Sequence, residues 1–281
     1  SKLHPNTKKI GNKVFQGNPK ITTAFISKNI VSIGDYAFEG CQQLSDVIFE
    51  AGSTALTVGD YAFSRCVKLA TIALPNCTSL IGRSAFEGSA LANCVLPEGL
   101  ITIGVSAFRS TMLTSIHIPA NVEMICDGAF AGSTLKTITF ADGDKPLAIG
   151  TLELVGVDKN GGDLGLGVFA NSKVTELYVP DRATHIGAYA FYRQTALTKV
   201  IMGPNCRLTE IGQYAFAHTT TTGSKLTTLT LGNHLQVVRD SAFSRAKLTG
   251  DLVLPKSVVL LESHAFRHNS FTTVTFEAGG T

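Results

Sequence analysis

Residues 103–119 read IGVSAFRSTMLTSIHIP, and the two patterns in this stretch recur along almost the whole chain. The first pattern is Ile-Gly-x-x-Ala-Phe. It gives clear or near matches that end at Phe15, Phe38, Phe63, Phe86, Phe108, Phe130, Phe191, Phe216, Phe243 and Phe266, and residues 164–169, LGLGVF, supply an eleventh at Phe169. Successive phenylalanines are 23, 25, 23, 22, 22, 39, 22, 25, 27 and 23 residues apart. Recurrence of one pattern at a nearly constant spacing indicates a repeat architecture.

The second pattern is Leu-x-x-Val-x-Leu-Pro, which occurs as LATIALP ending at Pro75, LTSIHIP ending at Pro119 and VTELYVP ending at Pro180. Its alternation of apolar and polar residues predicts a short β-strand. Proline has no amide hydrogen, so each proline is expected to end its strand. One strand in every turn of a coil predicts a parallel sheet.

Together the patterns predict a leucine-rich-repeat solenoid. We expect a right-handed curved coil of about eleven 22–25 residue repeats, with one parallel β-sheet on the concave face and short helical turns or irregular structure opposite. Residues 1–281 are expected to form a single solenoid domain, with an inserted loop at about 141–163. A second expansion, residues 219–225, is rich in threonine and is expected to be a surface loop.

The strand alternation also predicts which side chains are buried. Two apolar columns, one running from Val47 to Val274 and one from Phe49 to Phe276, should face the core together with the phenylalanine of each Ala-Phe pair. The outward residues between these columns are more apolar than a solvated face requires, which predicts a contact surface. Strand propensity by itself would also favour such residues. The candidate ligand-binding residues on this concave face are Phe25, Ile48, Val95, His117, Tyr178 and Ile201.

The combination of the two patterns resembles the BspA-like, or treponemal-type, leucine-rich repeats. The resemblance spans nearly residues 10–276, and a proline after the strand stands where common leucine-rich repeats have asparagine. It implies a cell-surface or secreted, and hence extracellular, protein that binds host proteins, other cells or extracellular matrix. It brings no shared catalytic residues.

Composition narrows the possible functions. Charged residues make up 16% of the chain and the net charge is +3. Since no run of lysine or arginine is longer than a pair, neither nucleic acid nor a membrane surface is an expected partner. Apolar stretches fall far short of the roughly 20 residues of a membrane span, so direct membrane insertion is not expected. The sequence starts at Ser1 without a charged stretch followed by an apolar one, and we expect that any signal peptide was removed or lies outside this sequence.

Several local features suggest chemistry only weakly. Residues 158–163, DKNGGD, lack the acidic spacing of a calcium loop, and His264 and His268 lack a third metal ligand, so a plain turn and surface histidines are favoured. Cys41 and Cys66 share a repeat position with Ser89, Thr111, Ser133, Ser172 and Thr219, which predicts a small, semi-polar, buried slot. A disulfide between the two cysteines is sterically conceivable, but most cysteines are expected to be free thiols.

No nucleophile motif, phosphate loop or catalytic carboxylate pair occurs at a meaningful spacing, so we expect no catalytic residues, metal or cofactor. The favoured function is a non-enzymatic adhesion module that binds a protein or glycan ligand through its concave sheet. An intracellular protein-interaction scaffold is the alternative, and a catalytic domain hidden in the insertion is a third possibility.

Overall fold

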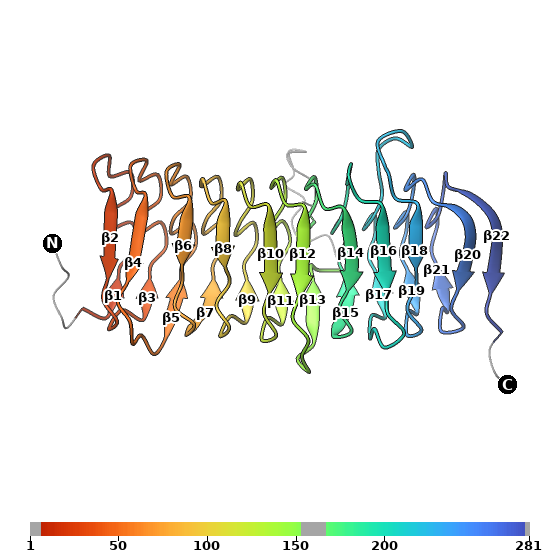
Figure 1. Cartoon of the computed structure of the whole chain (residues 1–281), viewed down its shortest axis with the longest axis horizontal. Helices are drawn as coiled ribbons and strands as arrows, with labels where there is room; N and C mark the ends of the chain where they lie inside the picture. The colour runs from red at the N-terminus through yellow and green to blue at the C-terminus, as the bar shows by residue number, and fades with distance from the viewer. Residues whose placement is uncertain (1–6, 153–166, 279–281) are drawn as a thin grey trace.

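The computed structural model describes residues 7–152 and 167–278, which form a parallel β-solenoid of about eleven turns. Each turn contributes one odd-numbered and one even-numbered strand (Figure 1). The odd-numbered strands are β1 (Lys9–Ile10), β3 (Ser32–Ile33), β5 (Leu56–Val58), β7 (Thr78–Ile81), β9 (Thr102–Ile103), β11 (Met124–Ile125), β13 (Leu147–Ile149), β15 (Ala183–Ile186), β17 (Glu210–Ile211), β19 (Val237–Val238) and β21 (Leu260–Leu261). The even-numbered strands are β2 (Thr23–Ile26), β4 (Asp46–Phe49), β6 (Thr71–Ala73), β8 (Asn93–Val95), β10 (Ser115–Ile118), β12 (Thr137–Phe140), β14 (Glu176–Val179), β16 (Lys199–Met202), β18 (Thr228–Thr230), β20 (Thr249–Leu254) and β22 (Ser270–Phe276).

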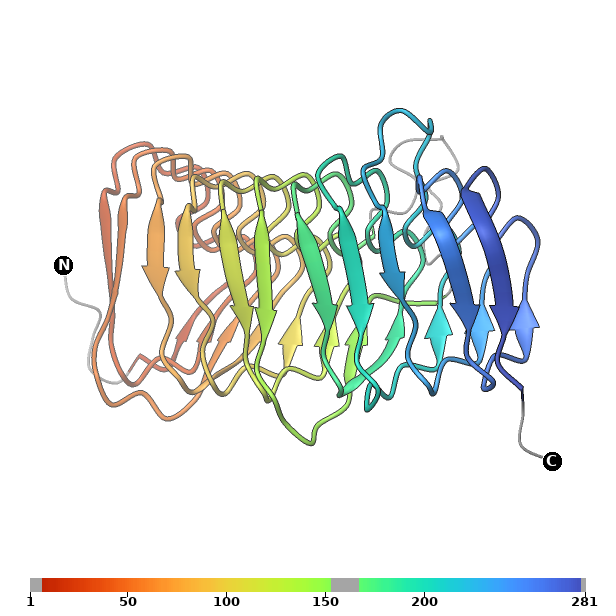
Figure 2. The same ribbon diagram turned by 45° about the vertical axis from the view of Figure 1, so that its right-hand side comes forward.

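The odd-numbered strands form one continuous eleven-stranded parallel sheet. They come from the residues just before the glycine of the Ile-Gly step, where β-branched side chains favour an extended backbone. Figure 2 shows that their arrows run opposite to those of the even-numbered strands. The prediction of a single sheet is therefore wrong, because the first pattern forms a strand as well as the second.

The predicted helical turns are also absent, since the described residues contain no helix. In most coils the residue two positions before the phenylalanine is left-handed, for example Tyr36 at φ 57° and Ser106 at φ 56°. One left-handed residue interrupts a right-handed helix. Amides in this segment instead donate to the next coil, as Phe108 does to the carbonyl oxygen of Ala129 at 2.7 Å.

The even-numbered strands form a row whose hydrogen-bonded ladder is interrupted. The paired sets are β2 with β4, β6 with β8, β10 with β12, β14 with β16 and β18, and β20 with β22. These strands stop at or just before the prolines of the second pattern, as β10 does before Pro119 and β14 before Pro180. The prediction of strand ends at proline is confirmed.

The ladder of phenylalanines forms the centre of the core. Neighbouring rings stack with centroids 5.0–5.4 Å apart from Phe15 to Phe266, and all the internal members are buried. Phe169 takes its place between Phe130 and Phe191, which confirms that an eleventh repeat phenylalanine lies here. Phe15 and Phe266 are only partly buried because each has a stacked ring on one side only.

The predicted core fails at the last strand. Val274 and Phe276 are 49% and 69% exposed, although their equivalents Leu252 and Leu254 in β20 are buried. In a solenoid each coil is buried by its two neighbours, and β22 has a neighbour on one side only.

The inserted residues begin later in the chain than position 141, where the predicted loop begins. Ile149 in β13 pairs with Ile125 and with Ile186, so residues 147–150, LAIG, are the regular Ile-Gly step of this coil. The expansion follows Gly150, and residues 153–163 of the predicted insertion lie outside the described part.

The threonine-rich expansion is a surface loop, as predicted, and it projects between β16 and β18 at the top of Figure 1. Thr219 is exposed and does not occupy the buried slot predicted for it. Because the loop is longer, Ser224 takes that place and donates to the carbonyl oxygen of Ala246 at 2.7 Å.

Candidate binding surface on the even-numbered strands

The outward side chains of the even-numbered strands form the candidate surface, which we call the strand face. Most of these strands alternate between inward and outward side chains, so that in β10 Ile116 and Ile118 are buried while Ser115 and His117 are exposed. Adjacent coils pair in register, and outward residues at equivalent repeat positions are therefore neighbours in space. All six predicted residues lie on this face.

An apolar patch lies at the amino-terminal end of the strand face. Phe25 in β2 is paired with Ile48 in β4, as predicted, and the two side chains are 57% and 47% exposed. An exposed aromatic ring beside an exposed aliphatic side chain is a typical interface anchor.

The centre of the strand face contains a pocket with a volume of about 280 Å³. It lies between β8 and β10, where the ladder is interrupted, and brings together the predicted residues Val95 and His117. Its lining is Asn93, Cys94, Val95, Leu96, Glu98, Ser115, Ile116 and His117. Val95 is 82% exposed at the rim, and His117 Nδ1 lies 2.9 Å from the hydroxyl of Thr139 in β12. The pocket thus has an apolar wall with polar groups around it.

The third group of predicted residues is less apolar than expected. Tyr178 in β14 is paired with Ile201 in β16, as predicted, but Ile201 is only partly exposed. The Tyr178 hydroxyl donates to Glu176 Oε2 at 2.9 Å, and Lys199 Nζ lies 5.6 Å from the ring centroid. This part of the strand face therefore holds an aromatic ring between opposite charges.

The structure brings the six predicted residues together in these three groups, along one row. The pocket was missed by the sequence prediction. Glu176 and Lys199 were identifiable, because both precede by two residues a predicted outward position. The pocket was not, because the interruption between β8 and β10 has no signature in the repeat pattern.

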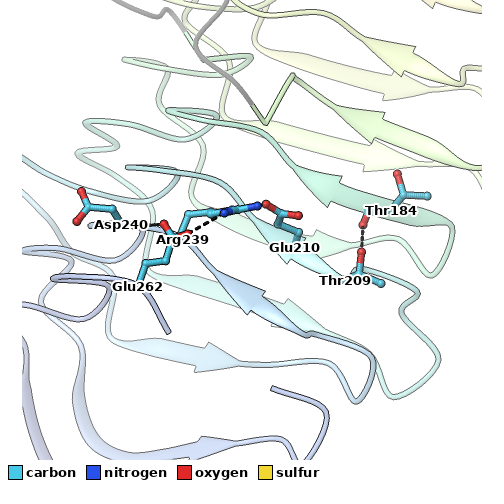
Figure 3. Close-up of polar contacts among 6 residues, drawn as sticks. All are labelled: Thr184, Thr209, Glu210, Arg239, Asp240 and Glu262. Atoms are coloured by element: carbon cyan, nitrogen blue, oxygen red, sulfur yellow. Dashed lines mark hydrogen bonds and ion pairs between the residues drawn. The ribbon is translucent and has the colours of Figure 1, made fainter. Parts of the chain in front are cut away.

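A second polar cluster lies at the carboxyl-terminal end of the odd-numbered sheet (Figure 3). Arg239 bonds Glu210 at 2.5 Å and Glu262 at 2.7 Å, and Glu262 also accepts from the backbone amide of Asp240 at 2.9 Å. These two hydrogen bonds raise the pKa of Arg239 above its usual range. The cluster therefore joins three consecutive coils.

His264 and His268 are both exposed, and His264 Nδ1 lies 3.6 Å from Asp240 Oδ1. No group of three or more His, Cys, Asp or Glu side chains in residues 7–152 and 167–278 could hold a metal ion. Residues 158–163, DKNGGD, lie outside the described residues.

All six cysteines lie within the described residues, and each is a free thiol. Cys41 and Cys66 do occupy buried slots, where their sulfurs donate to the carbonyl oxygens of Phe15 and Phe38 at 3.0 and 3.2 Å. Burial raises the pKa of the Cys66 thiol and that of the Cys94 thiol to about 12. The pocket sulfur of Cys94 is therefore protonated at neutral pH and acts as an apolar wall. Within the described residues there is also no helix long and apolar enough to cross a membrane.

A family model, the BspA type leucine rich repeat region, matches residues 49–147 and 162–281 in six copies. A leucine-rich repeat protein from Bacteroides ovatus is similar at 22% identity and a TM-score of 0.54, over 95% of this chain and 78% of that one. A leucine rich cell surface protein from Faecalibacterium prausnitzii has 21% identity and a TM-score of 0.46, over 96% and 83% of the two chains. A leucine rich repeat protein from T. pallidum has 27% identity and a TM-score of 0.45, over 53% and 69%. No curated protein matches the chain significantly. The similarity to the Bacteroides ovatus protein establishes that the two chains share a fold.

Proposed function

The chain belongs to the BspA type leucine-rich repeat family, and we propose that it is a non-enzymatic module that binds a protein partner through its strand face. The observation that carries the proposal is a row of exposed apolar and aromatic side chains with a pocket at its centre. Phe25, Val95 and Tyr178 are each more than half exposed on consecutive parts of this row. Contiguous exposed apolar surface marks interaction sites in soluble proteins.

The chemistry of the row suits a protein partner. The pocket beside Val95 and His117 can take one apolar side chain, while Glu98 and Ser115 at its edge can pair with polar groups. Interfaces combine a few buried anchors with a polar rim of this kind. Family membership also supports a location at the cell surface or outside the cell, and adhesion as the biological role. Antibody labelling of intact and permeabilised cells would test the location.

The binding test compares two double variants. Phe25→Ser with Tyr178→Ser removes anchors from the strand face. Val14→Ser with Met112→Ser removes apolar side chains of similar exposure, 54% and 57%, from positions outside the even-numbered strands. A partner captured with the unmodified protein from host-cell and matrix fractions is titrated against both by surface plasmon resonance.

We expect the strand-face variant to bind about 30-fold more weakly, since loss of interface anchors costs roughly 2 kcal/mol or more. The control variant should bind as the parent does. Both should keep the parent circular dichroism spectrum, because none of the four side chains is buried. Equal affinity of the two variants would overturn the proposal.

A further inference from the structure

A basic edge runs along the carboxyl-terminal half of the solenoid, apart from the strand face. It is formed by the segments that lead from each stacked phenylalanine to the next even-numbered strand, at the top of Figure 1. From Phe130 onward, these segments contain seven lysines or arginines and no aspartate or glutamate: Lys136, Lys173, Arg193, Lys225, Arg245, Lys247 and Arg267.

The solenoid brings these cations together. They are spread over more than 130 residues of sequence, but their coils stack with phenylalanine centroids 5.0–5.3 Å apart. Six coils at the parallel-strand spacing of about 4.8 Å place them along an edge roughly 25 Å long. A search for runs of basic residues in the sequence cannot detect such a row.

The charges on the basic edge lack an ion-pair partner within residues 7–152 and 167–278. Their contacts are neutral: Arg245 donates to the carbonyl oxygen of Thr219 at 3.1 Å, and the Arg193 guanidinium lies 5.2 Å from the centroid of Tyr192. Like charges held close together destabilise a fold, so an anion that screens them would bind favourably.

The surroundings of His268 show the same positive field. The pKa of His268 is lowered, mainly by desolvation and additionally by the positive charges of Arg267 and Arg245. This end of the edge therefore disfavours another cation.

The shape and the neighbouring groups identify the ligand class. The cations form a single row, which matches one linear chain of negative charges better than the two backbones of a nucleic acid duplex. Exposed hydroxyls are interleaved with the row at Thr134, Thr175, Thr195, Thr198 and Thr227, and they can bond sugar hydroxyls. The segments that follow the even-numbered strands instead mix carboxylates, such as Glu98, Asp142 and Asp181, with cations, so the opposite edge has no comparable row of one sign.

We propose that the basic edge binds a linear acidic polysaccharide, one bearing sulfate or carboxylate groups, independently of a protein on the strand face. The probe is dextran sulfate, with neutral dextran as the uncharged comparison, measured by isothermal titration calorimetry. The test variant replaces Lys136, Lys173 and Lys247 by glutamine. The control replaces Lys28, Arg207 and Lys256 by glutamine, which makes the same charge change on exposed residues that follow even-numbered strands.

Dextran sulfate should bind the parent and neutral dextran should not. The test variant should bind at least 10-fold more weakly, and the slope of log affinity against log salt should fall by roughly two, because fewer counterions are released. The control should lose less than threefold. Equal losses in the two variants would reduce the effect to net charge and overturn the proposal, as would failure of dextran sulfate to bind at low salt.

Duplex DNA serves as the competitor. Free DNA and free dextran sulfate are each used to displace bound dextran sulfate, at concentrations counted in negative charges. If DNA were effective at the lower concentration, the acidic polysaccharide would be the wrong ligand class. The strand-face variant with serine at positions 25 and 178 should bind dextran sulfate like the parent. That result separates this proposal from the proposed protein-binding function.

Discussion

Replacing Arg182 by methionine should weaken the middle of the solenoid. Arg182 is only 2% exposed, and its guanidinium donates to the carbonyl oxygens of Val122 at 2.7 Å and Pro119 at 2.9 Å. Longer bonds reach Ala141 at 3.2 Å and Lys145 at 3.4 Å. The side chain therefore joins the turns of three consecutive coils.

The residue beside Arg182 is small. Ala183 is buried at the repeat position that Val122 occupies two coils earlier, as counted from Pro180 and Pro119. Desolvation lowers the pKa of Arg182 from its ordinary value, so the charge is held at some cost by four backbone acceptors.

The two shorter bonds set the size of the effect. Hydrogen bonds to a charged group contribute about 1.5–3 kcal/mol each, which gives roughly 3–6 kcal/mol. Methionine restores the apolar contacts and avoids the cost of burying a cation, so we expect a net loss of about 3 kcal/mol. Arg207→Met is the control, because Arg207 is exposed, and surface changes of this kind stay within about 0.5 kcal/mol.

Urea unfolding followed by circular dichroism measures the loss. Hydrogen exchange with mass spectrometry localises it, and peptides covering residues 119–149 should exchange faster in the Arg182 variant while the terminal coils change little. If both variants had the same urea midpoint and the same exchange in residues 119–149, the clamp assigned to Arg182 would be refuted.

Three further outcomes follow from the packing and the thiols. Phe108→Ala should cost about 3–5 kcal/mol in chemical denaturation, because it empties a fully buried ring site; a loss below 1 kcal/mol would contradict the stacked core. Gly104→Ala should destabilise the fold well beyond Gly11→Ala, since a Cβ at Gly104 would lie 2.6–2.7 Å from backbone atoms of the preceding coil, whereas at Gly11 the nearest atom is 3.4 Å away; equal melting temperatures would show that the coils separate freely. The free energy of unfolding should fall as pH rises from about 9 toward 12, because the Cys66 and Cys94 thiols, with pKa values raised to about 12, stay protonated in the folded state while the unfolded thiols ionise. Cys66→Ala with Cys94→Val should flatten this slope relative to the parent, and an unchanged slope would place the effect on other groups.

The repeat pattern by itself determined the solenoid, the stacked core and the pairs on the strand face. The pairing of Phe25 with Ile48 and that of Tyr178 with Ile201 could be predicted because parallel coils stack in register. Equivalent positions in successive repeats are then neighbours in space. Burial of the internal phenylalanines follows from the same relation, since each ring has a copy on either side.

The tertiary structure decided features that depend on how coils differ from one another. The second sheet was missed because residues such as Thr102 and Ile103 give a strand too short to show an alternation. The exposure of Phe276 depends on the missing neighbour beyond β22, which no repeat position records.

The binding surfaces depended most on tertiary structure. The pocket beside Val95 exists because the hydrogen-bonded ladder is interrupted between β8 and β10, and an interruption between strands is a property of their separation. The basic edge consists of cations from successive coils, which lie 20 residues or more apart in sequence except for Arg245 and Lys247 in one coil. Their electrostatic fields reinforce one another only because the coils stack about 5 Å apart, since Coulomb interactions depend on distance in space and not on distance in sequence.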